Sequence, residues 1–247
     1  MENILSKIDW NMAFGYKKYT FTLAEIRDLL ISVAVLGIVF SFGDWSLKNY
    51  LMSIAIVGPA LLFHELAHKL MAQKYDLLAV YVMWPTGIAI ALLFSVLTMG
   101  NFVFAALGAV MISPAYHTRL GYRFIGLTSS QLGKISIVGP MTNIVLAIIS
   151  YILLPYSPVF FAMSAHINII IALFNCLPIP PLDGTKIFRW NIPVWLGIFA
   201  SAIVLWLLPP FIGLLWSIII SILLLVGSFI LVQFFFPVGQ QSATEFK

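Results

Sequence analysis

The strongest constraint on this chain is a charge-free apolar run that ends in a cluster of ionisable residues. Residues 51–63 contain no charged side chain, and the motif HExxH follows directly, from His64 to His68. In a helix, residues four apart lie on one face, so both imidazoles can reach one ion, and Glu65 falls on the adjacent face. An ionisable group at mid-bilayer costs about 2.5–3.5 kcal/mol on insertion scales, so such a cluster indicates a functional site.

This motif is typical of zinc hydrolases. The two histidines bind the metal, and the glutamate between them acts as a general base instead of a ligand. In a soluble protein so short a motif often arises by chance. Within an apolar span, the alternative requires three polar side chains to find other partners where there is no water. The sequence therefore favours a zinc site with His64 and His68 as ligands and Glu65 as the catalytic residue.

Composition places the chain among integral membrane proteins. Of its 247 residues, 62% are hydrophobic and 9% are charged, whereas soluble domains carry about 25% charged residues. The first twenty residues lack the apolar core of a cleavable signal peptide. Cys176 is the only cysteine, which excludes an intramolecular disulfide. The net charge of +4 is expected of basic membrane loops and indicates no nucleic-acid role.

Apolar runs separated by turns predict one all-α, polytopic membrane domain over 1–247, with about six transmembrane helices. A capping box, Thr22 with Glu25, predicts the first helix start at Leu23. A short strand at the membrane surface is expected over 18–22. The expected spans are Leu29–Phe42, Asn49–Lys74, Ile135–Leu154, Val159–Phe174, Pro193–Leu208 and Phe211–Phe236.

The positions of lysine and arginine predict the orientation, because cytoplasmic loops are enriched in both. With six spans and the amino terminus inside, twelve of the thirteen basic residues fall on the inner side, and Lys48 falls outside. We therefore expect a multi-pass protein of the cell membrane with both termini in the cytoplasm.

The segment Gly87–Ile112, after the second helix, is apolar but is interrupted by Gly100 and Asn101. A single crossing here would put Asp183 on the face opposite His68. We therefore expect a re-entrant or membrane-associated β-hairpin segment that enters and leaves on the inner side, with 102–110 as the strand that faces a substrate. A simple seventh span is the alternative.

A catalytic zinc needs three protein ligands and an open position. His117 lies in a basic loop and is expected at the surface, while His166 is in mid-span and is expected to bond a neighbouring helix. Asp183 is better placed, because the prolines before it and Gly184 after it break the helix on the inner side. Taken alone, Leu-Asp-Gly would be an ordinary turn. Beside a buried HExxH, it predicts Asp183 as the third ligand.

These motifs together resemble the site-2 protease family of intramembrane zinc proteases. The resemblance rests on the HExxH, on Gly139–Asn143 and on Asn175–Gly184, and covers about 51–190. It implies one zinc bound by His64, His68 and Asp183, with Glu65 as the base. It also implies that Asn143 and Asn175 line the cleft and bind the substrate. The alternative for each asparagine is an amide that packs helices together.

On this basis we expect a catalytic core over about 49–190, C-terminal helices over about 193–236, and no PDZ or CBS module. The expected function is regulated intramembrane proteolysis, that is, hydrolysis of peptide bonds in or near transmembrane segments of membrane-protein substrates. A zinc-binding scaffold without activity would not need Glu65. A metal transporter would need ligands across the whole membrane, but the candidates cluster on one side.

Overall fold

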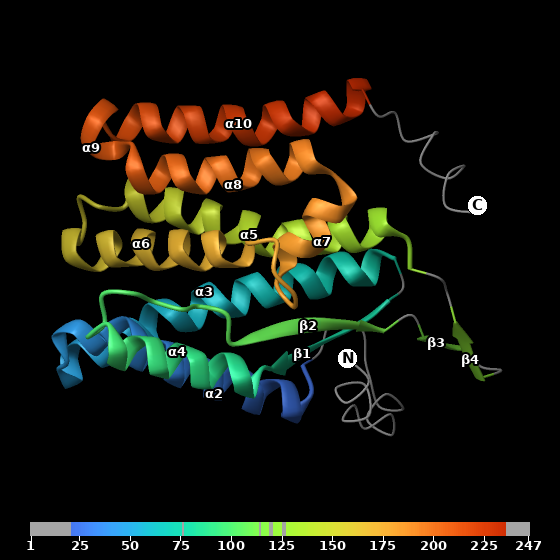
Figure 1. Ribbon diagram of the computed structural model, residues 1–247, viewed down its shortest axis with the longest axis horizontal. Helices are drawn as coiled ribbons and strands as arrows, with labels where there is room; N and C mark the ends of the chain where they lie inside the picture. The colour runs from blue at the N-terminus through green and yellow to red at the C-terminus, as the bar shows by residue number, and fades with distance from the viewer. Residues whose placement is uncertain (1–20, 76, 114, 119–120, 125–126, 236–247) are drawn as a thin grey trace.

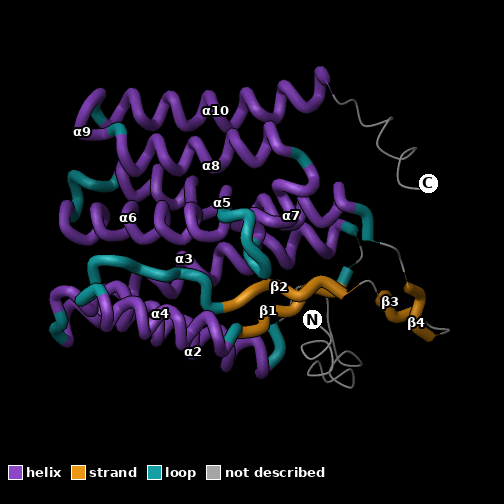
Figure 2. The backbone as a smooth tube through the Cα atoms, viewed as in Figure 1, coloured by secondary structure: helices purple, strands orange, loops and turns teal. Residues whose placement is uncertain are grey.

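The computed structural model describes residues 21–75, 77–113, 115–118, 121–124 and 127–235 (Figure 1). Most of the described chain is helical, and the long helices lie in layers along the longest axis of the molecule (Figures 1 and 2). The helices are α2 (Leu23–Ser41), η2 (Phe42–Asp44), α3 (Leu47–Lys74), α4 (Pro85–Leu97), α5 (Ser129–Ile152), α6 (Pro158–Asn175), α7 (Asp183–Trp190), α8 (Ile192–Leu207), α9 (Pro209–Ile212) and α10 (Leu214–Phe235).

Local sequence explains where several of these helices begin. Thr22 and Glu25 form the expected capping box at the start of α2. At α5 the equivalent pair is Thr128 with Gln131, and Ser46 caps α3. Each cap satisfies backbone N–H groups that the first helical turn leaves without partners.

Three helices in the described part of the chain are long and apolar enough to cross a membrane, namely α3, α5 and α6. Helices α8 and α10 are also apolar, whereas α2 carries Glu25, Arg27 and Asp28 in its first two turns. All six expected spans coincide with a helix of this set. Six membrane crossings are therefore a proposal, which rests on the helices and on the distribution of basic residues.

Two small antiparallel sheets accompany the helices in the described part of the chain. In the first, β1 (Leu78–Met83) pairs with β2 (Gly108–Ser113). In the second, β3 (Ala115–Thr118) pairs with β4 (Gly121–Phe124). The strand expected over 18–22 lies largely outside the described residues, as does the side chain of His117.

The segment after α3 differs from the simple hairpin that the sequence predicts. Between β1 and β2 the chain forms α4 and then returns in extended conformation (Figure 2). The tip of this excursion packs on η2, where a Cβ on Gly100 (φ +78°) would lie 2.4 Å from the Gly43 nitrogen. The expected strand over 102–110 is wrong over 102–107, because β2 begins at Gly108, which pairs with Met83 at the end of β1.

Two apolar clusters hold the helices together. One joins α5, α6, α7 and α8 around Ile144 and Ile198, and the other joins α2, α3, α4 and α6 around Leu36 and Ile167. Since α3, α5 and α7 meet between these clusters, the residues that those three helices carry are held on well-packed elements.

Candidate metal centre

The HExxH motif lies in the second half of α3 and is buried. His64 and His68 are each 2% exposed, and Glu65 is 5% exposed. The two imidazoles lie one turn apart on the same face of the helix, with their Nε2 atoms 3.1 Å apart. This is the arrangement that the spacing of the motif predicts.

Asp183 meets both histidines from the first residue of α7. Its Oδ2 atom lies 2.8 Å from His68 Nε2 and 3.5 Å from His64 Nε2. One donor atom from each of the three residues lies within 4.8 Å of the others. The structure thus brings together the three residues that the sequence predicts as metal ligands.

Gly184 explains how the chain can deliver Asp183 to this position. A Cβ at Gly184 would lie 2.1 Å from the Cys176 carbonyl oxygen and 2.4 Å from that of Leu177. A side chain there would push α7 away from the end of α6. The Leu-Asp-Gly sequence therefore forms a turn and also lets the backbone of Gly184 lie close to that of Cys176 and Leu177.

Helix α5 fixes the orientation of both histidine rings. His68 Nδ1 donates to the Ile135 carbonyl oxygen over 2.7 Å, and His64 Nδ1 hydrogen-bonds the side-chain oxygen of Asn143. A proton on each Nδ1 leaves each Nε2 as the free lone pair that faces Asp183. Outer partners of this kind fix the tautomer and orientation of metal-binding histidines.

The residues around the three donors fit a zinc ion. Two imidazole nitrogens and a carboxylate oxygen form a typical catalytic zinc donor set. Gly139 lies directly against them, and a Cβ there would be 2.2 Å from His68 Nε2 and 2.6 Å from His64 Nε2. The lack of a side chain at this position keeps the space at the two nitrogens open.

Two further ionisable groups complete the site. Glu65 is buried, and its Oε2 atom has no hydrogen-bond partner among the residues that the structure describes. Lys186 Nζ lies 3.3 Å from Asp183 Oδ1, the oxygen that faces away from the histidines. Burial alone would raise the pKa of Asp183, but the positive charge beside it, including that of Lys186, holds it well below its usual range. Asp183 is therefore ionised, as a metal ligand must be.

The other residues singled out in the sequence have different surroundings. Asn143 is fully buried, and its amide nitrogen donates to the Ala60 carbonyl and to Asn168. Asn175 is half-buried at the end of α6 and donates to the Ile171 carbonyl of its own helix. His166 is exposed on α6 and lies outside the metal-binding cluster.

Sequence reasoning missed three contributors to the site. Asn168 carried a usable signal, because an amide within an apolar span needs a partner, and it accepts from Asn143 over 2.9 Å. Gly139 belongs to the Gly139–Asn143 motif, but the sequence does not indicate that it lies against the two histidines. The Ile135 contribution is a backbone carbonyl, so no residue type could have indicated it.

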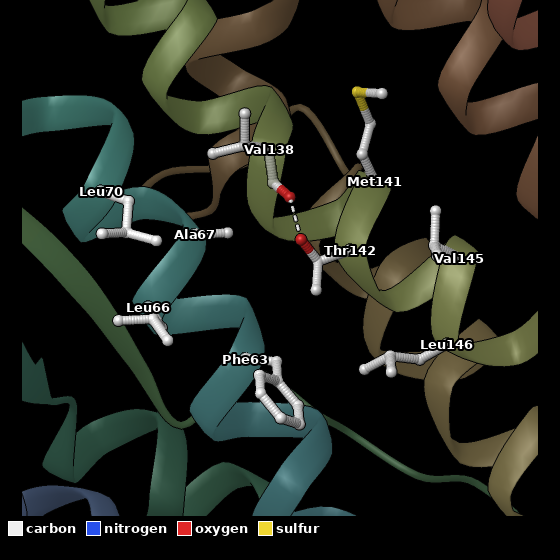
Figure 3. Close-up of a pocket in the computed structure, with 9 residues that line it drawn as sticks. All are labelled: Phe63, Leu66, Ala67, Leu70, Val138, Met141, Thr142, Val145 and Leu146. Atoms are coloured by element: carbon white, nitrogen blue, oxygen red, sulfur yellow. Dashed lines mark hydrogen bonds between the residues drawn. The ribbon is translucent and has the colours of Figure 1, made fainter. Parts of the chain in front are cut away.

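An apolar groove of about 490 Å³ lies between α3 and α5 (Figure 3). On α3 it is lined by Phe63, Leu66, Ala67 and Leu70, which helical geometry turns away from the face that carries His64 and His68. Its one polar side chain, Thr142, is already bonded to the Val138 carbonyl. The metal centre and this groove are therefore separate features of the same two helices.

Comparison with known proteins gives two relatives. The chain is 34% identical over 183 residues to a Methanocaldococcus jannaschii protein named "Putative zinc metalloprotease MJ0611", covering 72% of this chain and 90% of the relative. It is also 34% identical over 74 residues to "Putative zinc metalloprotease YwhC" of Bacillus subtilis, covering 24% of this chain and 34% of that protein. No family model matches the sequence, and no solved structure matches it.

Proposed function

Since the chain belongs to the zinc metalloprotease family of these relatives, we propose that it is an intramembrane endopeptidase of the site-2 type. Zinc is the cofactor indicated by the family and by the cluster of His64, His68 and Asp183. The proposed substrates are membrane proteins, cut in or near their transmembrane segments. Cleavage within the membrane and the site-2 type go beyond what membership of the family shows.

The observation that carries this proposal is the convergence of α3 and α7 on one buried point. Asp183 Oδ2 lies within 3.5 Å of both histidine Nε2 atoms, although Asp183 is far from both histidines in the sequence. One of the helices that supply them, α3, is long and apolar enough to cross a bilayer. A hydrolytic centre on such a helix is suited to a substrate that is itself in the membrane.

Zinc bound by the three residues would supply a Lewis acid for the scissile carbonyl and would lower the pKa of a water molecule. Glu65 is the group placed to move the proton. Its Oε2 atom is buried beside the ligands, without a partner in the described part of the chain, so it can accept a proton from water and return it to the leaving amine. Lys186 holds Asp183 through its second oxygen, and α5 holds the two imidazoles.

We propose different roles for the two asparagines. Both hydrogens of the Asn143 amide already have acceptors within the protein, which favours a role in holding His64 over contact with the substrate. Asn175 is half-buried, and its amide makes one hydrogen bond within α6. Its oxygen and second hydrogen are therefore available to a substrate backbone.

The substrate must be extended before it is cut, because helical peptide bonds are shielded by their own hydrogen bonds. A strand edge can hold an extended chain through backbone hydrogen bonds, and β2 supplies one beside the bundle (Figure 1). If α2, α3, α5, α6, α8 and α10 each cross the membrane, the number of crossings is even, and Lys48 is the one basic residue of the sequence on the outer side. This distribution supports an inner location for the site and for both termini.

The test is cleavage of single-span membrane proteins co-expressed with the wild type or with Glu65→Gln. The amide keeps the shape of the side chain but cannot accept the proton, so cleavage should fall by roughly 100-fold or more, while zinc content stays at the wild-type level. Asp44→Asn is a matched control, because Asp44 is an exposed acid beyond the far end of α2. Equal cleavage by Glu65→Gln would refute the catalytic role, and a zinc-loaded wild type that cuts no substrate would favour the scaffold.

A further inference from the structure

The sheet formed by β1 and β2 has two outer edges, and they differ in accessibility. Trp84 N–H donates to the Leu107 carbonyl over 2.7 Å. The backbone N–H and C=O groups of the even-numbered residues of β1 therefore point toward β2. The odd-numbered residues then point their N–H groups away from the sheet, because direction alternates along a strand. Tyr81 and Met83 therefore lie on the outer edge of β1.

Two carboxylates of α2 close this edge. Glu25 Oε1 accepts the N–H of Tyr81 over 3.1 Å, and Asp28 Oδ2 accepts the N–H of Met83 over 3.2 Å. Both acids are buried, at 1% and 5% exposure. A helix that carries two acids one turn apart thus satisfies two N–H groups that are two residues apart on the strand.

The outer edge of β2 has no such cover. By the same register, Gly108, Val110 and Ile112 point their backbone groups away from β1. None of these groups has a hydrogen-bond partner within the described part of the chain. Among the residues that the structure describes, the sheet therefore leaves the edge on β2 open to an extended chain.

Glu25 also ties the sheet to the catalytic helix. Lys69 Nζ lies 2.6 Å from the same Glu25 Oε1 atom, and both side chains are almost completely buried. Lys69 follows the ligand His68 directly in α3. A short path of contacts, from Tyr81 through Glu25 to Lys69, therefore connects the strand to the metal centre.

We propose that Glu25 and Asp28 are positioning residues for proteolysis, a role that rests on the proposed function. They leave β2 as the edge that receives the substrate, and they fix the distance of that edge from His68. An extended substrate contributes alternate residues to each face of the sheet. A fixed sheet therefore determines which of its peptide bonds lies at the metal centre.

The experiment compares the cleavage products of the wild type, Asp28→Ala and Asp28→Asn, using a substrate that the wild type cuts. Alanine removes the acceptor for Met83 N–H, so the single cut should broaden to neighbouring bonds, and KM should rise about fivefold for one lost hydrogen bond. Asparagine keeps an oxygen that can accept, and it should restore the single cut. Glu25→Gln, which loses the ion pair with Lys69, should broaden the cut further.

Hydrogen exchange of the peptide containing Tyr81 and Met83 gives a measurement that is independent of activity. It should quicken in Asp28→Ala and return toward the wild-type rate in Asp28→Asn. Faster exchange with an unchanged single cut would overturn the proposal, because the carboxylates would then only stabilise the sheet. Zinc content and Tm identify any variant that does not fold. If Asp28→Ala does not fold, the exchange rate and the cleavage products of Asp28→Asn are compared with those of the wild type. No cleavage by the wild type would instead refute the proposed function.

Discussion

The side-chain oxygen of Asn143 in α5 hydrogen-bonds Nδ1 of His64 in α3, and the amide nitrogen of the same residue donates to Asn168 in α6 over 2.9 Å. One buried amide thereby joins three helices at a proposed metal ligand. Its loss would free the His64 ring to rotate and would leave the Asn168 oxygen without its donor.

We therefore predict that Asn143→Ala weakens zinc binding by roughly 10–100-fold, the usual effect of removing an outer partner of a metal ligand. Competition with a chelator measures this directly on the purified protein. Asn175→Ala is the matched control, since the Asn175 amide donates within α6 and its loss should leave zinc affinity unchanged. Equal zinc affinity in the two variants would contradict the orienting role of Asn143.

Asp183→Ala should lose most of its zinc, because two imidazoles remain of a three-ligand site. The purified wild type should carry about one zinc ion per chain, as expected for one such site. Metal analysis after gel filtration checks both values. Lys186→Met removes the ammonium group that lies 3.3 Å from Asp183 and should retain zinc. This control distinguishes loss of the metal ligand from loss of the ion pair beside it. Full zinc in Asp183→Ala would exclude this residue as a ligand.

Gly139→Ala should abolish zinc binding while the helices stay intact. The added methyl would lie 2.2 Å from His68 Nε2 and would occupy the space beside the donors. Gly227→Ala in α10 makes the same chemical change where a Cβ meets nothing within 4 Å. That variant should be stabilised by about 0.5–1 kcal/mol, because alanine favours helix. Circular dichroism and metal analysis measure the two effects, and normal zinc in Gly139→Ala would show that the gap is not needed.

Burial raises the pKa of the Cys176 thiol, so the native cysteine stays protonated at neutral pH and should react slowly with maleimide. In a Cys176→Ser background, a cysteine at Ser129 should be labelled only from the inner side of oriented vesicles. A cysteine at Leu47, which is exposed at the opposite end of α3, should be labelled only from the outer side. Outside labelling at Ser129 would mean that the segment before α5 crosses the membrane once.

The parts of the fold that depend on local pattern were predictable from the sequence. The capping box at Thr22 gave the start of α2, and the apolar runs gave six long helices close to their observed bounds. His64 and His68 were predictable because ionisable groups are rare in such runs, and Asp183 was predictable from the prolines and glycine that break the helix around it. Their convergence was expected from the proposed topology, in which an even number of crossings separates α3 from α7.

The sheet was harder to predict, for physical reasons. Residues 78–83 are almost uniformly apolar, so β1 has no alternation that distinguishes it from a short buried helix. Its stability comes from partners far away in the chain, namely β2 and the carboxylates of Glu25 and Asp28. These two acids, read in sequence alone, are only charges in the first turns of a helix.

The ligands on α3 and the ligand on α7 are far apart in the order of synthesis. At about 5–20 residues per second, roughly ten seconds separate translation of the HExxH from that of Asp183. Throughout that interval the nascent chain has two of its three ligands and lacks the helix that closes the site. The metal centre of each new chain therefore cannot form until translation has passed Asp183.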